Sequence, residues 1–271
     1  MFLNMIREPA VAGQFYNRDP EVLRLEISRL VVEKEPKVEA KAVVVPHAGY
    51  MYSGHVAGAV YGRLVPPEVA VVIGPNHTGL GKKAALLSYG AFLTPLGKVP
   101  IEASLAETLL QKLPFLKEDT LAHLYEHSLE VQVPFLQYLN PSLNLVPICL
   151  ARISYEEISA LGRALAEAIE DHPRRITVVA STDFSHYVSD EVARTKDRLA
   201  LDRILALDSR GFLEVVVREN ISMCGAIPTA VAIEAARHLK ASRAELVKYA
   251  TSGEVSGDYA QVVGYGGVMI W

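Results

Sequence analysis

The sequence is poor in cysteine, which excludes the large class of small secreted proteins held together by disulfides. Only two of its 271 residues are cysteines, Cys149 and Cys224, whereas disulfide-stabilised domains carry many at short spacings. Each cysteine is therefore expected to be either a packed apolar side chain or a reactive or metal-binding thiol.

The sequence also lacks any apolar run close to the roughly 18 residues that a membrane-spanning helix needs. Its first residues, MFLNMIREPAVAGQFY, have too short an apolar part and too early a charge for a signal peptide. We therefore expect a cytoplasmic protein that has no membrane partner.

An excess of charge of one sign is missing as well. The 27 Lys and Arg residues nearly balance the 31 Asp and Glu residues, and the formal net charge is -4. Proteins that bind the phosphate backbone of a nucleic acid usually carry a basic patch. Nucleic acid is therefore not expected among the partners.

Linkers, internal repeats and low-complexity tracts are absent, and every candidate loop is short. A chain of 271 residues is long for one domain, but α/β folds with one large sheet reach this length. We expect a single domain over residues 1–271.

What the sequence does contain is a series of short apolar runs that alternate with segments of helical periodicity. Many runs are continuous and rich in Val and Ile, which is typical of strands covered on both faces. Strands are predicted at 41–46, 69–74, 84–88, 144–151, 175–181, 244–250 and 262–271. Helices are predicted at 54–64, 101–113, 127–139, 154–170, 189–207 and 226–239. This order predicts an α/β fold with a largely parallel central sheet flanked by helices.

Ionisable side chains follow three of the predicted strands at the point where each strand ends. His47 lies in VVVPHAG, His77 lies in VVIGPNHTG, and Asp183 and His186 lie in VVASTDFSH. Ligands of open α/β sheets gather at the carboxyl ends of the strands, so these four side chains are expected to share one pocket. A lone histidine is more often structural, and Asp183 is alternatively a helix cap, a role compatible with orienting His186 for acid–base chemistry.

The two cysteines have different contexts. Cys149 lies inside the predicted strand LVPICLA and is expected to be a small packed hydrophobe. Cys224 precedes a glycine and a long apolar helix, where backbone N–H groups and the helix dipole are expected to lower its pKa. Cys224 is therefore predicted to be a nucleophile or a metal ligand.

A further histidine, His127, lies three residues before Glu130 in YEHSLEVQVPFL. The two residues form either a ligand pair on a helix or a capped helix start with a surface ion pair. We keep His127 as a candidate catalytic residue. No supporting context accompanies the remaining histidines, which are expected to be structural or exposed: His55, His123, His172 and His238.

Six motifs together resemble those of the Memo family, which occurs from archaea to animals. They run in order from about residue 7 to the C-terminus: REPAVAGQFY, PHAGYMYSGHVAGAVY, GPNHTG, EHSLEVQVPFL, STDFSHY and MCGAIPTA. Memo proteins resemble in fold the LigB-type class III extradiol dioxygenases, which hold non-haem Fe(II) with two histidines and one glutamate. The resemblance implies that His47 and His77 are metal ligands and that Cys224 stands in place of the glutamate. It also implies that His186 is the acid–base histidine, with Asp183 beside it.

The thiol in place of a carboxylate changes the chemistry that the resemblance implies. Two histidines and a thiolate form a softer site, which shifts preference toward copper or zinc while still accepting iron. Dioxygen also oxidises a thiolate. We expect Fe(II) or copper as the cofactor, with zinc as the alternative, and ring cleavage is not inherited with the fold.

Three functional hypotheses follow. The first is a metal-dependent redox enzyme with a His/His/Cys site, in which His186, oriented by Asp183, moves a proton. The second is a non-catalytic module that binds a protein or peptide in a dioxygenase-like cleft. The third is metal-free catalysis with Cys224 as nucleophile and His186 as base.

The resemblance also bears on partners. Animal Memo proteins are described as binding phosphotyrosine peptides, a role that the few Arg and Lys residues of the motifs do not favour. Prokaryotic members are linked by gene neighbourhood to a radical-SAM protein, in a group called AmmeMemoRadiSam. The substrate is expected to be a small molecule or a peptide, and the sequence identifies neither it nor the oligomeric state.

Overall fold

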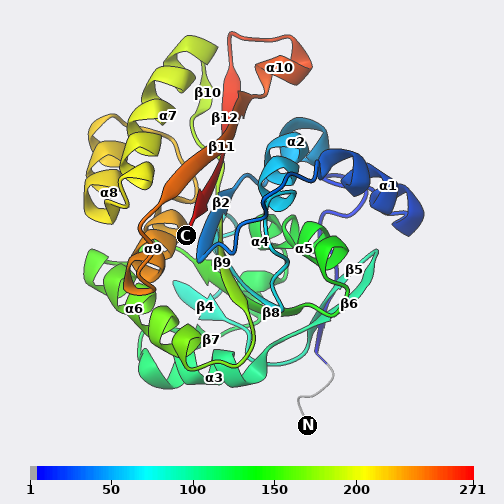
Figure 1. Cartoon of the computed structure of the whole chain (residues 1–271), viewed down its shortest axis with the longest axis vertical. Coiled ribbons are helices and arrows are strands. Elements are labelled where there is room, and N and C mark those ends of the chain that lie inside the picture. The colour runs from blue at the N-terminus through cyan, green and yellow to red at the C-terminus, as the bar shows by residue number, and fades with distance from the viewer. Residues whose placement is uncertain (1–4) are drawn as a thin grey trace.

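The centre of the molecule is a sheet whose four inner strands are parallel (Figure 1). The computed structural model describes residues 5–271. The first four residues, where the N-terminal stretch compared above with a signal peptide begins, lie outside the described residues. The inner strands lie in the order β2 (Ala42–Val45), β9 (Ile176–Ser181), β3 (Val69–Pro75) and β8 (Asn144–Leu150). Almost all of their residues are buried, as the apolar runs predict.

Antiparallel strands extend this sheet at both sides. On one side β12 (Val262–Ile270) pairs with β2, with β11 (Ala244–Thr251) and with β10 (His186–Val188). On the other side β4 (Ala84–Leu86) pairs antiparallel with β8 and parallel with β7 (Lys117–Glu118). The predicted α/β class is confirmed, with a sheet that is parallel in its centre and mixed at its flanks.

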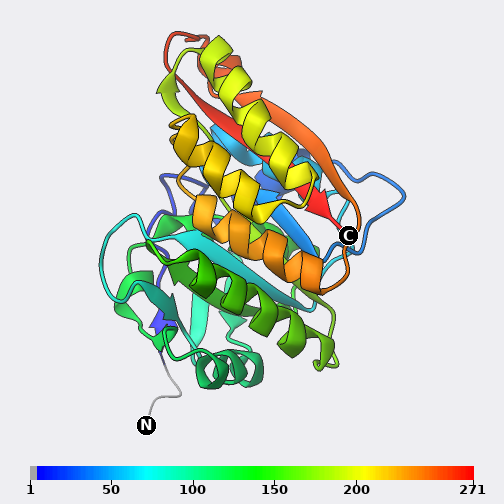
Figure 2. The ribbon, with the colours of Figure 1, turned by 90° about the vertical axis from the view of Figure 1, so that its left-hand side faces the viewer.

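Helices cover both faces of the sheet. One face carries the row seen in Figure 2, formed by α6 (Tyr155–Glu170), α7 (Asp190–Leu205), α8 (Ser209–Arg218) and α9 (Ala226–His238). The other face carries α1 (Pro20–Leu30), α2 (Tyr50–Tyr61), α4 (His127–Glu130) and α5 (Val133–Leu139). Two further helices lie outside these layers: α3 (Ala103–Lys112), which packs on α6, and the short α10 (Gly253–Ser256).

All seven predicted strands and the six predicted helical segments are present, with two differences. The predicted helix 127–139 is interrupted between Glu130 and Val133, where Pro134 in the first turn of α5 supplies no backbone N–H. The helix expected from residue 54 begins at Tyr50, directly after Gly49. Some elements were not predicted, among them α1, α8, the single turn Leu121–His123 and a small sheet of β1 (Ile6–Arg7), β5 (Ala91–Thr94) and β6 (Gly97–Pro100).

The connections after two neighbouring inner strands diverge. From β3 the chain continues to β4, which pairs beyond β8, whereas from β9 it continues to β10, which pairs with β12 on the opposite side. A crevice lies at the carboxyl ends of β3 and β9, lined by His77 after β3 and by Asp183 after β9. Ligands bind at this place in open α/β sheets.

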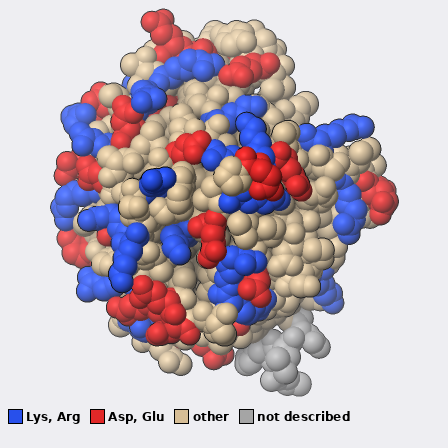
Figure 3. All heavy atoms as spheres, viewed as in Figure 1, with Lys and Arg blue, Asp and Glu red and all other residues tan. Residues whose placement is uncertain are grey.

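The surface carries no large region of one charge on the face in Figure 3, where basic and acidic side chains intermingle. Within residues 5–271, no helix is both long enough and apolar enough to cross a membrane.

Candidate metal centre

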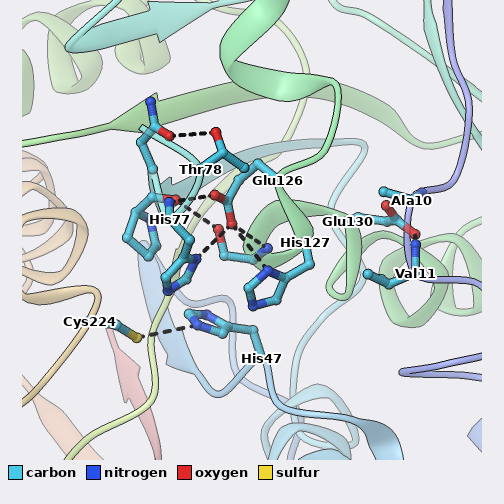
Figure 4. Close-up of polar contacts among 12 residues, drawn as sticks. Ala10, Val11, His47, His77, Thr78, Glu126, His127, Glu130 and Cys224 are labelled. Atoms are coloured by element: carbon cyan, nitrogen blue, oxygen red, sulfur yellow. Dashed lines mark hydrogen bonds and ion pairs between the residues drawn. The ribbon is translucent and has the colours of Figure 1, made fainter. Parts of the chain in front are cut away.

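Three of the predicted side chains converge at the crevice (Figure 4). His47 follows β2, His77 follows β3, and Cys224 precedes α9. One ligand atom from each of the three lies within 4.8 Å of the others. The Cys224 sulfur is 3.3 Å from Nε2 of His47.

The proton on the His47 ring is placed by buried hydrogen bonds. Ser181 donates its hydroxyl hydrogen to the carbonyl of Ser128 at 2.7 Å, so its oxygen accepts from Nδ1 of His47 at 3.0 Å. The side-chain amide of Gln132 donates to the same oxygen at 2.8 Å. Nδ1 of His47 therefore carries the hydrogen, and the lone pair of Nε2 faces Cys224.

Burial keeps this imidazole neutral. His47 is only 2% exposed, and burial, followed by the neighbouring rings of His127 and His77, lowers its pKa well below the ordinary value. A neutral imidazole is the form that binds metal ions, so His47 is held in the protonation state that a metal ligand requires.

A buried carboxylate holds His77 in the same way. Glu126, only 1% exposed, accepts hydrogen bonds from Nδ1 of His77 at 2.8 Å and from its backbone N–H at 2.6 Å. Burial alone would raise the pKa of Glu126, but the hydrogen bonds from His77 and Ser128 outweigh it and lower the pKa to about 2. The anionic carboxylate keeps the hydrogen on Nδ1, as in carboxylate–histidine–metal arrangements.

Glu126 was missed by the sequence analysis, which paired His127 with Glu130 instead. Glu130 points away from the cluster and accepts from Arg7, Tyr16 and the backbone N–H groups of Ala10 and Val11 (Figure 4). The alternative of a ligand pair of His127 and Glu130 is therefore wrong, whereas the alternative of a capped helix start at His127 is present. The signal in the sequence was the glutamate directly before a histidine at a helix start, since Glu126 also caps α4.

The expected low pKa of Cys224 is wrong as well. Burial, followed by the negative charge of Asp183, raises the pKa of this thiol to about 12. The backbone N–H of Asp183 approaches the sulfur at 3.3 Å but does not compensate. The thiol is therefore protonated at neutral pH, and a positive ion bound to the sulfur is what makes the thiolate accessible.

His186 is held by backbone carbonyls rather than by Asp183. Its Nδ1 lies 2.8 Å from the carbonyl oxygen of Phe184 and 2.9 Å from that of Ser222. Because carbonyls only accept, Nδ1 carries the hydrogen and Nε2 is left to accept a proton.

Asp183 serves a different neighbour. It accepts the backbone N–H of His47 at 2.8 Å, and burial raises its pKa to about 6. Within residues 5–271 its carboxylate forms no direct hydrogen bond to His186, so the expected orienting contact is replaced by the carbonyls.

A cavity of about 460 Å³ brings most of the candidate residues together. His47, His77, His127, Asp183 and His186 all line it. The ring centroid of His127 is 4.6 Å from that of His77 and 5.4 Å from that of His47. Burial lowers the pKa of His127. His127 thus stands beside His47 and His77, and its chemical role stays a prediction.

Cys224 does not line this cavity but a neighbouring one. Cys224 lines a second, more apolar cavity of about 570 Å³ between α6, α8 and the start of α9. The sulfur approaches His47, whereas no hydrogen bond joins it to His186 within residues 5–271. This geometry does not suit the hypothesis of a Cys224 nucleophile activated by His186.

The remaining candidates lie away from the cluster. Cys149 is buried in β8, and burial raises the pKa of its thiol, as expected for a packed residue. His55 lies in the middle of α2 rather than at its start. His123 is buried, and burial lowers its pKa to about 3.

Comparison with known proteins gives one consistent result. The family model described as Memo-like protein matches residues 7–269. A MEMO1 family protein of Methanopyrus kandleri is 46% identical to this chain, with 98% of this chain and 99% of that protein covered. MEMO1 family proteins of Methanothermobacter thermautotrophicus and Aquifex aeolicus are each 44% identical, covering 96% and 97% of this chain and 99% and 98% of their own.

Proposed function

Because the chain belongs to the Memo family, we propose that it is a metal-binding protein of the redox type whose ion is held by His47, His77 and Cys224. One observation carries the proposal: the Nε2 lone pair of His47 faces the Cys224 sulfur while buried partners occupy Nδ1 of both histidines. A site whose donors are oriented in advance loses little conformational entropy when an ion binds.

The donor set indicates which ions fit. Two imidazoles and a thiolate suit iron, copper and zinc better than magnesium or calcium, which prefer oxygen ligands. We propose Fe(II) or copper as the bound ion, with zinc as the redox-inactive alternative. A bound iron or copper ion would supply one-electron redox chemistry at the strand ends.

The chain's own residues supply proton transfer and positioning. Nε2 of His186 is free to take a proton from a substrate in the cavity, because Nδ1 donates to the carbonyls of Phe184 and Ser222. His127, on the same cavity, is proposed as a second group that contacts the substrate. Ring cleavage is not part of the proposal, because the thiol replaces the carboxylate of the extradiol dioxygenases.

The test is the metal content of the protein purified without air. We expect stoichiometric metal in the unchanged protein and little or none in His47→Ala and Cys224→Ala, because each change removes one of three ligands. His238→Ala, which alters an exposed histidine at the end of α9, is the matched control and should retain its metal.

The same measurement separates the two functional hypotheses. Metal content that is unchanged in both ligand variants would overturn the proposed site. A protein that purifies without metal and takes none up would favour the alternative, a non-catalytic module that binds a protein or peptide in the cavity.

A further inference from the structure

The wall of the 460 Å³ cavity is rich in aromatic residues and contains neither lysine nor arginine. Besides the histidines, four aromatic residues line it: Phe15, Tyr52, Tyr187 and Tyr265. Neither lysine nor arginine is part of the lining, and Asp183 is its one carboxylate. The lining therefore combines aromatic rings and tyrosine hydroxyls with a single carboxylate.

These aromatic residues form a connected group. Tyr52 and Tyr265 pack in the same small apolar cluster. The hydroxyl of Tyr265 lies close enough to Asp183, Tyr52 and Tyr187 for their charges, after burial, to raise its pKa. The ring of Phe15 is 4.9 Å from that of His127. The aromatic residues thus line the same cavity as the histidine cluster.

Tyr187 is held at this cavity in a strained conformation. Its φ is 56°, in the left-handed region that side chains other than glycine rarely adopt. It lies where the pairing of β10 with β12 shifts register between His186 and Val188. Such bulges often redirect a side chain beside an active site. Tyr187 is 74% exposed although it lines the cavity, so burial does not account for the strain.

Electrostatics decides which ligands such a cavity favours. The face of an aromatic ring attracts cations, most of all weakly hydrated alkylammonium groups. A phosphate or carboxylate finds no arginine or lysine to pair with here.

We propose that the cavity binds an alkylammonium group between Tyr52, Tyr187 and Tyr265, beside the metal-binding residues. This inference rests on the proposed function and deepens it, because it assigns the substrate a positively charged amine. The group is positioned in front of His186, whose ring lies 5.9 Å from that of Tyr187.

The test compares choline with dimethylbutanol, the neutral alcohol in which carbon replaces the choline nitrogen. Isothermal titration calorimetry on the purified protein with its metal should give a dissociation constant about tenfold lower for choline. Phenyl phosphate serves as the anionic probe and should bind more weakly than choline. Equal affinity for choline and the alcohol, tighter binding of phenyl phosphate, or no binding of choline would overturn the proposal.

Variants locate the binding and separate it from the metal site. Tyr187→Leu and Tyr52→Leu should each weaken choline binding several-fold without changing metal content, whereas Tyr187→Phe, which keeps the ring, should preserve it. Tyr259→Leu, at a half-exposed tyrosine outside the cavity, should have no effect.

The His47→Ala variant distinguishes the two proposals. It should lose metal yet still prefer choline to the neutral alcohol, because the aromatic wall is intact. Loss of metal with retained choline binding supports both proposals. Unchanged metal content overturns the metal site alone, and equal affinity for the two probes overturns the alkylammonium site alone.

Discussion

Glu126 and Glu130 lie four residues apart at the two ends of one helical turn, and both are almost completely buried. Glu130 gathers the N-terminal segment through Arg7, Tyr16 and two backbone N–H groups. Glu126 instead accepts hydrogen bonds from a candidate metal ligand, His77. The difference shows that burial alone does not give the role of a carboxylate. Its hydrogen-bond partner decides whether it stabilises the fold or orients a side chain of the candidate site.

The largest effect is expected from removing Glu130, the carboxylate that anchors the N-terminal segment. Glu130→Ala leaves the guanidinium of Arg7 buried without its counter-ion, so the free energy of unfolding should fall by about 3–5 kcal/mol. Urea denaturation measures it. Glu167→Ala, which breaks an exposed ion pair with Lys112, is the control and should change the free energy of unfolding far less, because solvent screens an exposed pair. A similar small loss for both variants would contradict the assignment of Glu130 as an anchor.

Glu126→Gln should affect the metal instead of the fold. Glutamine retains an acceptor for Nδ1 of His77 but removes the negative charge, so metal affinity should fall about 10–100-fold. Competition with a chromophoric chelator measures the affinity, and urea denaturation should show a smaller loss of stability than for Glu130→Ala. Unchanged metal affinity would show that Glu126 is only a structural residue.

The pH dependence of metal binding tests whether the Cys224 thiol is a ligand. The pKa of Cys224 is raised to about 12, so the metal-free thiol is protonated at neutral pH and an ion that binds its sulfur must displace the proton. Affinity should therefore increase with pH, by about tenfold per pH unit between pH 6 and pH 8. Chelator competition at several pH values measures this slope. A flat profile would mean that the thiol is not a ligand.

A smaller effect on metal affinity is expected when the hydrogen-bond partner of His47 is removed. Ser181→Ala removes a neutral acceptor from Nδ1 of His47, and a neutral hydrogen bond contributes about 0.5–1.5 kcal/mol. Metal affinity should fall by less than about tenfold, and by less than in Glu126→Gln. The same chelator competition compares the two variants. A larger loss of metal affinity in Ser181→Ala than in Glu126→Gln would contradict the expectation that a charged hydrogen-bond partner contributes more than a neutral one.

Much of the fold was predictable because local patterns specify it. The run KAVVVP is too apolar and too β-branched for an exposed loop, and it forms β2 in the centre of the sheet. Segments without such patterns were missed: β1, β5 and β6 are two to four residues long, which is too short for periodicity to register. The division of 127–139 into two helices does have a local signal, because Pro134 supplies no backbone N–H to a continuous helix.

The site was predictable in its membership and less so in its contacts. His47, His77, Asp183 and His186 follow strand ends, and the structure brings all four to one cavity. Their hydrogen-bond partners were not predictable, because Ser181 and Glu126 lie 134 and 49 residues away from the histidines that they hold. The predicted pKa of Cys224 was wrong. The neighbouring helix start predicts a stabilised thiolate and a lowered pKa, whereas burial is the larger effect and raises the pKa.

By itself the sequence determined which segments become strands and helices and which reactive side chains follow the strand ends, because periodicity and chain order act locally. Only the tertiary structure decided that Glu126 holds His77 while Glu130 holds Arg7, and that the thiol of Cys224 stays protonated. Hydrogen-bond partners and desolvation depend on what packs around a group, and those neighbours come from distant parts of the chain.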